Sequence, residues 1–252
     1  MVMPLMLARV ASLALLAGFL APAVRAEIKF HSGPAQVALV ELYTSEGCSS
    51  CPPAEKWLGE LRANPGLWRQ FVPVAFHVNY WDRLGWRDKL ASKEFTDREY
   101  AYSAAWNSSS VYTPCFVRNG AEWRVHDGDP GTRGQAAAGE LTLAWQDDGT
   151  CRLDYAAPAG ASGNFEVSVA LLGGGIVSNV RAGENSGREL RHEFVALRLA
   201  AAPLQRGEGG TFSATLTMPA RPDAGATRRA IAAWVTKPGR LQPLQATGGW
   251  LE

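Results

Sequence analysis

The strongest hydrophobic pattern of the chain lies in residues 36–78. Residues 36–44 are rich in β-prone side chains and alternate between apolar and polar positions from Val40 onward, which predicts a strand that ends at Thr44. Residues 71–78 are almost continuously apolar, as expected for a strand buried on both faces of a parallel sheet. Between these runs, residues 54–62 carry an apolar stripe at helical spacing, formed by Trp57, Leu58 and Leu61. The pattern therefore predicts a strand–helix–strand unit.

The pattern continues with a second helix and a third strand. Residues 92–106 carry aromatic side chains among charged ones and predict an amphipathic helix. Residues 111–117 predict a strand with Pro114 inside it. A proline conflicts with a central strand unless it lies at the strand's start or carries a special geometry such as a cis bond.

A hairpin and a last helix complete this part of the chain. Asn119-Gly120 between apolar runs predicts a tight hairpin turn, with a return strand over residues 122–126. Residues 135–145 predict a final helix. With a right-handed crossover, this order of elements is that of an α/β thioredoxin-like domain, to which we assign residues 27–148.

The character of the chain changes from Cys151 onward. Short strand-like runs are separated by turns rich in glycine and proline, at intervals typical of all-β sandwiches. We therefore expect an all-β, sandwich-like C-terminal domain over residues 149–252. Its predicted strands cover residues 152–155, 164–172, 189–199, 211–218 and 230–237.

Residues 1–26 have the features of a secretory signal. Arg9 precedes an apolar run over residues 10–21, and Val24-Arg25-Ala26 places small residues where a signal peptidase requires them. The run is far shorter than the ~20 residues of a membrane-spanning helix. We expect cleavage after Ala26 and a periplasmic or secreted protein with no stable membrane span, while an uncleaved anchor stays open as an alternative.

The charge balance gives no reason to expect a nucleic-acid or membrane partner. The chain has 25 basic and 24 acidic residues, and removal of Arg9 and Arg25 with the signal leaves 23 against 24. A mature charge near −1 provides no electrostatic attraction to nucleic acid or to anionic membranes.

The candidate chemistry lies in the sequence Cys48-Ser49-Ser50-Cys51, directly before the first helix. Because the start of a helix favours an anion, Cys48 is expected to be the more acidic and the more exposed of the two thiols. Cys51 lies three residues on and can close a small disulfide ring with it. A thiolate beside a resolving thiol is the arrangement used in thiol–disulfide exchange.

Two other interpretations of this pair stay open. The pair can be half of a zinc site, although the chain has no second CxxC and no HxxxH. It can also be an inert structural disulfide, since an exported chain is in an oxidising compartment. For the remaining two cysteines, Cys115 and Cys151, the sequence leaves two possibilities open: a disulfide between them, or free thiols.

The chain also resembles known families. Residues 36–145 resemble the thioredoxin superfamily, with a CxxC after the first strand and a Thr-Pro before a hairpin strand. Nearly the whole mature chain is similar to the exported bacterial family DUF1223. Cys115 is a departure, because a glutamine is expected after the Thr-Pro, and a third thiol there can pair with Cys48. The DUF1223 resemblance rests on VELYTSEGCSSCPPAE (40–55), AFHVNYWDRLGW (75–86), VYTP (111–114) and RAGENSG (181–187).

The resemblance implies roles for five residues. Cys48 is the attacking thiolate and Cys51 the resolving thiol. Pro114 is a cis-proline facing the disulfide, and Thr113 offers backbone groups to an extended substrate. Glu41 is a candidate proton relay to Cys51, but it lies one residue farther from the CxxC than in thioredoxins, which can place it on the opposite face of the strand.

The sequence thus predicts an exported thiol–disulfide oxidoreductase whose partners are protein or small-molecule thiols and disulfides. The predicted chemistry uses no cofactor and no metal. One alternative is a redox-inert binding module with a structural disulfide. Another is a copper- or other metal-binding protein in which His77 joins the two thiolates, since sulfur and imidazole suit Cu(I). The simpler interpretation of His77 is a hydrogen-bonded core histidine.

Overall fold

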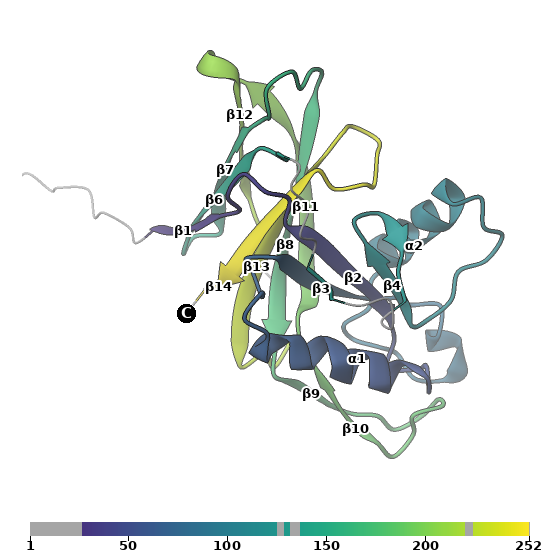
Figure 1. Cartoon of the computed structure of the whole chain (residues 1–252). Helices are drawn as coiled ribbons and strands as arrows, with labels where there is room; N and C mark the ends of the chain where they lie inside the picture. Colours follow the sequence, from purple (N-terminus) through teal and green to yellow (C-terminus); the bar gives the residue numbers. More distant parts are fainter. Residues whose placement is uncertain (1–26, 125–128, 132–136, 220–223, 252) are drawn as a thin grey trace, which may run out of the picture.

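A computed structural model describes residues 27–124, 129–131, 137–219 and 224–251. The predicted signal segment, residues 1–26, lies outside the described residues, as does part of the predicted return strand. The described residues form a large mixed sheet of 12 strands, a separate two-stranded hairpin and two α-helices (Figure 1).

One arm of the sheet carries both helices. Its strands run in the order β14-β13-β8-β11-β3-β2-β4-β5. Two neighbouring pairs in it, β2 with β3 and β3 with β11, are parallel. Its strands are β2 (Ala38–Thr44), β3 (Phe71–His77), β4 (Cys115–Arg118), β5 (Ala121–Glu122), β8 (Phe165–Gly174), β11 (Val195–Arg206), β13 (Arg228–Thr236) and β14 (Gln245–Trp250).

The other arm continues from the far end of β11. Gln205 and Arg206 of β11 pair with β12, and the order then runs β12-β7-β6-β1 (Figure 1). The two arms face each other across an apolar core in which Leu143 and Leu153 meet Val167 and Val235. The strands of this arm are β1 (Glu27–His31), β6 (Glu140–Gln146), β7 (Thr150–Ala156) and β12 (Thr211–Thr217).

The two helices pack on opposite faces of β2 and β3 because side chains alternate along a strand. Helix α1 (Cys51–Glu60) packs Leu58 against the face of β2 that carries Val40 and Leu42. Helix α2 (Lys93–Ala105) begins at the capping residue Ser92 and packs against the face that carries Tyr43. The separate hairpin, β9 (Ile176–Asn179) with β10 (Glu189–His192), runs beneath α1 (Figure 1).

The predicted fold class, an α/β thioredoxin-like domain followed by a separate β sandwich, is wrong. The described residues contain two α-helices against fourteen strands, and a single mixed sheet includes strands from both halves of the chain. Val195 of β11 pairs with Ala75 of β3, so β11 extends the sheet that the N-terminal half begins. The expected boundary at 148/149 falls in the turn between β6 and β7, which pair with each other. The reason is that sheet edges left open by one segment are paired by strands from the other.

The predicted helix over residues 135–145 is also wrong. Residues 140–146 form strand β6, in which Leu141, Leu143 and Trp145 point to the buried face at every second position. Gly139 has a positive φ of +81°, a conformation that does not continue a helix. The alternation of buried and less buried side chains in this segment is that of a strand rather than a helix. Strand β6 pairs with β1 and β7.

Most other local predictions are confirmed. The structure has the predicted strands at β2 and β3, the helices α1 and α2, and the hairpin that turns at Asn119 and Gly120. Four predicted C-terminal runs correspond to β7, β8, β12 and β13, and the run over 189–199 is divided between β10 and β11. Strands β1, β9 and β14 have no counterpart in the prediction.

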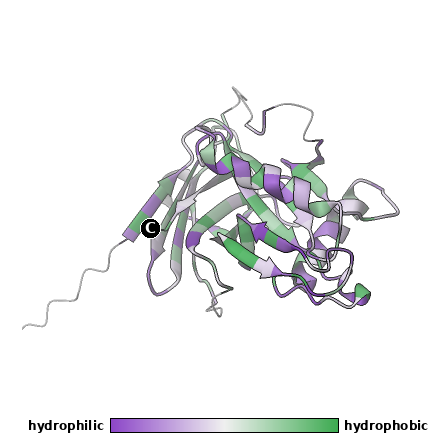
Figure 2. Cartoon of the chain, turned by 90° about the horizontal axis from the view of Figure 1, so that it is seen from below, coloured by the Kyte–Doolittle hydropathy of each residue, from purple (hydrophilic) through white to green (hydrophobic). Residues whose placement is uncertain are grey.

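Hydrophobic and hydrophilic residues are interspersed along both helices and many of the strands (Figure 2). Among the described residues, no helix has the length and apolar character needed to cross a membrane.

Candidate functional site

The two cysteines of the CxxC lie in the tight connection between β2 and α1. The backbone N–H of Cys48 donates to the carbonyl of Ser45 at 3.2 Å, and the N–H of Cys51 donates to the carbonyl of Cys48 at the same distance. Helix α1 begins at Cys51, and two prolines follow in its first turn, where they remove no helical hydrogen bond. Cys48 therefore lies one turn before the helix rather than at its first residue.

The two thiols are free, and each affects the acidity of the other. A hydrogen bond from Cys51, helped by the side chains of Ser50 and Thr113, lowers the pKa of Cys48 to about 6 against the opposing effect of burial. Burial and the hydrogen bond to Cys48 raise the pKa of Cys51 far above its ordinary value. The expected order of acidity is thus present, but its main cause is the neighbouring thiol rather than the end of the helix.

Both thiols are buried, and Cys48 is more exposed than Cys51 by only a marginal difference. Cys48 is 1% exposed and Cys51 is 0% exposed, whereas Ser49 and Ser50 between them are exposed. The Cys48 Sγ lies 3.3 Å from the Ser50 Oγ and 3.6 Å from the carbonyl oxygen of Thr113. The thiol is therefore covered by the loop before β4 and is nearest to solvent on the side of Ser50.

The Thr113–Pro114 peptide bond is cis, which confirms that prediction. Pro114 directly precedes β4, so it removes no hydrogen bond from the ladder of the sheet. The Trp81 Nε1 donates to the Thr113 Oγ1 at 2.8 Å. Thr113 and Pro114 are thus brought to Cys48, and the aromatic loop after β3 holds Thr113 in place.

The turn between β9 and β10 covers the CxxC loop from the other side. The side-chain amide of Asn185, which is 0% exposed, donates to the carbonyl oxygens of Glu46 and Cys48 at 2.9 and 2.8 Å. The backbone N–H and the hydroxyl of Ser49 donate to the Glu184 carboxylate at 2.9 and 2.8 Å. The turn, which belongs to the RAGENSG segment, fixes the conformation of a loop more than 130 residues away in sequence.

Glu41 lies on the face of β2 that packs against α2, opposite the face that contacts α1. Its carboxylate accepts hydrogen bonds from Tyr43 at 2.9 Å and Tyr102 at 2.6 Å, and it pairs with Arg98 at 2.8 Å. Glu41 is therefore bound to an arginine and two tyrosines on the face of β2 opposite the CxxC. The acid on the face nearest the cysteines is Glu55.

A buried polar cluster lies beneath the CxxC on that side. Thr44 donates to Glu55 at 2.6 Å, and Glu55 makes a very short hydrogen bond with the Nδ1 of His192 on β10. Although burial opposes protonation, Glu55 and Glu46 raise the pKa of His192 to about 10. Thr44 also hydrogen-bonds Cys51, so the cluster is linked to the resolving thiol.

His77 forms the second half of this cluster. Its Nδ1 lies 2.7 Å from Asp88, and its ring packs edge-on against His192 with centroids 5.1 Å apart. Both rings are completely buried. Asp88 also accepts the backbone N–H groups of Glu46 and Leu90, which connects the cluster to the CxxC loop.

Sequence reasoning named His77 but missed the other members of the cluster. Glu55 lies in the CxxC segment, one helical turn after Cys51, and this spacing on α1 was a usable signal. Nothing in the strand-like pattern of residues 189–199 marks His192 as functional, because its partners come from distant segments. The residues missed are Thr44, Glu46, Glu55, Asp88, Asn185 and His192.

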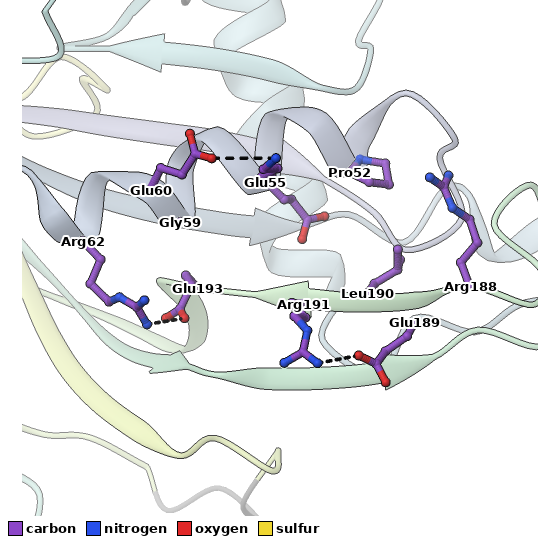
Figure 3. Close-up of a pocket in the computed structure, with 11 residues that line it drawn as sticks. Pro52, Glu55, Gly59, Glu60, Arg62, Arg188, Glu189, Leu190, Arg191 and Glu193 are labelled. Atoms are coloured by element: carbon purple, nitrogen blue, oxygen red, sulfur yellow. Dashed lines mark hydrogen bonds and ion pairs between the residues drawn. The ribbon is translucent and has the colours of Figure 1, made fainter.

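Two hollows in the surface flank α1. One, of about 740 Å³, is lined by Ser50, Pro114 and the aromatic rings of Trp57, Phe116 and Trp123. The other, of about 490 Å³, lies between α1 and β10, and the Glu55 side chain extends into it from the helix (Figure 3). Ion pairs of Arg62 with Glu193 and of Arg191 with Glu189 lie at its border (Figure 3).

The remaining two cysteines are buried and free, and no disulfide joins them. Cys115 belongs to the core beside α2, and Cys151 belongs to the apolar core between the two arms of the sheet. Burial raises the pKa of each thiol to about 12. Of the two possibilities left open by the sequence, the structure has the free thiols.

Two solved structures are similar to this chain in fold. A crystal structure of a structural-genomics target from Agrobacterium tumefaciens matches with a TM-score of 0.58 and 21% identity, over 86% of this chain and 94% of that one. HBP35 of Porphyromonas gingivalis matches with a TM-score of 0.59 and 14% identity, over 86% of this chain and 76% of that one. At these identities the likeness concerns the fold alone.

The sequence comparisons add a family assignment without an activity. No curated protein is detectably similar to the chain. A family model described as "Protein of unknown function (DUF1223)" matches residues 39–236, which include the CxxC, the cis-proline, the buried histidines and the turn at Asn185. The chain therefore belongs to the DUF1223 family.

Proposed function

We propose that the protein exchanges thiols and disulfides through Cys48 and Cys51. The observation that carries the proposal is the hydrogen-bonded pair of free thiols in which the pKa of Cys48 is lowered to about 6. At neutral pH a thiol of this acidity is about 90% ionised, and the thiolate is the nucleophile in exchange. Cys51, held protonated beside it, supplies the second thiol.

The reaction proceeds in two balanced steps. The Cys48 thiolate attacks one sulfur of a substrate disulfide, a mixed disulfide forms, and the other substrate sulfur leaves as a thiolate. Cys51 then gives its proton to a departing thiolate and attacks the Cys48 sulfur, which releases the second substrate thiol. The protein loses two electrons in forming the Cys48–Cys51 disulfide, and the substrate gains them. The reverse sequence oxidises a dithiol substrate.

The surroundings of Cys48 support a protein or small-molecule thiol as the partner. Ser49 and Ser50 are exposed, and the aromatic groove of about 740 Å³ begins at Ser50 and Pro114. Because the Ser50 Oγ lies 3.3 Å from the Cys48 Sγ, we expect a substrate disulfide to reach the sulfur from this end of the groove. The signal-like residues 1–26 support a periplasmic or secreted location for this chemistry.

Trapping the mixed disulfide tests the proposal. In a Cys51→Ser variant, Cys48 can attack a substrate disulfide but nothing resolves the product, so a stable adduct is expected on Cys48 by mass spectrometry. A Cys48→Ser variant is the matched control and is expected to form no adduct. An adduct formed equally on Cys115 or Cys151 would contradict the proposal.

The reduction potential of the pair separates exchange from a structural disulfide. An exchange protein is expected to equilibrate with a glutathione buffer, in the range of about −120 to −270 mV. A potential below about −300 mV would assign the pair to an inert disulfide and would favour a redox-inert binding module.

A further inference from the structure

The buried cluster beneath the CxxC contains three potential metal-ligand side chains that have no role in the proposed thiol exchange. Glu55, His77 and His192 each have a potential ligand atom within 4.8 Å of those of the other two, and all three residues are buried. They come from three different elements, α1, β3 and β10, so the tertiary fold assembles the group. The Nε2 of His77 has no hydrogen-bond partner, although the ring is 0% exposed.

An unpartnered imidazole nitrogen in the interior is costly unless something binds it. The Nδ1 of His77 lies 2.7 Å from the Asp88 carboxylate, so Nε2 is the ring nitrogen left to coordinate an ion when Nδ1 donates to Asp88. A histidine whose other nitrogen is bonded to a carboxylate is the usual arrangement around metal ions.

In His192 the roles of the two ring nitrogens are exchanged. Its Nδ1 faces Glu55, and its Nε2 lies 3.4 Å from the Glu46 carboxylate. A cation placed between Glu55 and Nδ1 takes the position of the proton that joins them, and Glu46 is then the outer carboxylate that orients the ring. Each imidazole thus has one nitrogen for a cation and one for a supporting acid.

We propose that Glu55, His77 and His192 form a binding site for one divalent transition-metal ion, with Zn²⁺ as the first candidate. Two imidazoles and one carboxylate with a fourth position left open form a donor set known from zinc enzymes.

The ligand atoms need a local adjustment on binding. Zinc bonds of about 2.0–2.2 Å place tetrahedral ligand atoms about 3.3–3.6 Å apart. All three ligand atoms lie within 4.8 Å of one another, and Glu55 and the Nδ1 of His192, now joined by a very short hydrogen bond, must move apart to admit the ion. The hollow of about 490 Å³ between α1 and β10 reaches Glu55 and offers a route for the ion (Figure 3). Neither Cys48 nor Cys51 is a ligand of this site, so metal binding can be measured separately from the proposed exchange activity.

The test uses the full chain with both thiols removed, Cys48→Ser/Cys51→Ser, so that bound metal cannot be held by sulfur. After treatment with a chelator, titration with Zn²⁺ against a chromogenic chelator is expected to give one ion per chain. Co²⁺ is expected to give tetrahedral d–d absorption bands without a sulfur-to-metal charge-transfer band. X-ray absorption at the zinc edge is expected to show nitrogen and oxygen neighbours only.

Single substitutions then assign the ligands. His77→Gln and His192→Gln are each expected to weaken Zn²⁺ affinity at least about 100-fold, and Asp88→Asn, which removes the outer acid, about 10- to 100-fold. His31→Gln is the matched control, since His31 is an exposed histidine outside the cluster and is expected to bind as the parent does. Circular dichroism establishes that each variant is folded.

Three results would overturn the proposal. They are the absence of stoichiometric binding by the folded double-serine chain, sulfur among the neighbours of zinc in the wild-type chain, or equal affinity in His77→Gln and His31→Gln. The absorption measurement on the otherwise unchanged cluster decides the question even if a histidine variant fails to fold. None of these outcomes affects the mixed-disulfide test of the exchange activity.

Discussion

The CxxC region and the apolar core between the sheet arms both contain buried free cysteines, in opposite chemical surroundings. Cys48 is 1% exposed and Cys151 is 0% exposed, yet the pKa of Cys48 is lowered to about 6 and that of Cys151 is raised to about 12. Burial disfavours the thiolate at both positions. The difference arises because Cys51, Ser50 and Thr113 offer hydrogen bonds to Cys48, while burial is the cause at Cys151.

The same contrast extends to the residues around the two sites. Beneath the CxxC, carboxylates, histidines and an asparagine are buried and joined by hydrogen bonds. The described core cluster that contains Cys151 is made of aliphatic, aromatic and methionine side chains. In the CxxC region hydrogen bonds control the ionisation of a buried thiol, whereas in the apolar core burial excludes water. Substitutions in the two regions are therefore expected to have different consequences.

The largest expected effect is on the rate of disulfide exchange. Cys48→Ser is expected to lower the rate with a chromogenic aryl disulfide at neutral pH by at least about 1,000-fold, because a thiol of pKa about 12 is ionised only to about one part in 10⁵. Cys151→Ala is expected to keep the rate within about twofold. Comparable losses in both variants would show that the two regions do not differ in reactivity.

The next effect concerns pH. Reactivity of the reduced protein is expected to fall as the pH drops through about 6, because protonation removes the Cys48 thiolate. Cys51→Ala removes the hydrogen bond that is the largest cause, so the midpoint is expected to move up toward the ordinary value of 9.0. The pH dependence of thiolate absorbance in the ultraviolet measures both midpoints. An unchanged midpoint in Cys51→Ala would show that Ser50, Thr113 or the backbone, rather than Cys51, lowers the pKa of Cys48.

Two core substitutions separate stability from reactivity. Leu153→Ala, in the apolar core, is expected to lower the free energy of unfolding by about 2–5 kcal/mol with no change in the pKa of Cys48. Asn185→Ala leaves two buried carbonyl groups without a donor and is expected to cost about 2–4 kcal/mol, and also to alter the reactivity of Cys48. Urea denaturation and alkylation rates of the same samples test both statements, and Ser186→Ala is the exposed control.

The smallest effect is expected at Cys151 itself. Cys151→Ala removes one buried sulfur atom from the apolar core and is expected to lower the free energy of unfolding by about 1 kcal/mol. The midpoint of urea denaturation measures it. A loss as large as that in Leu153→Ala would indicate that the sulfur makes a specific interaction rather than filling space.

Local signals along the chain were enough to predict the strands β2 and β3, both helices and the hairpin after Pro114. The cysteine pair and the cis bond at Pro114 also followed from residues close together in sequence. The helix predicted over 135–145 failed because its alternating leucines suit a strand, and only the pairing with β1 and β7 shows which period is used. The exported state and the exchange activity stay predictions.

By itself the sequence determined which short segments become strands or helices and which two thiols lie next to each other, because these features depend on neighbours within a few residues. The tertiary structure decided that β11 joins β3 and makes one sheet of two expected domains. It also decided which acid lies beside the cysteines. Side chains alternate along β2, so Glu41 faces α2 and Thr44 faces Glu55, while His192 arrives from a strand 137 residues after Glu55. Contacts of this separation depend on how the whole chain closes its open sheet edges and buries its polar groups, which no local pattern records.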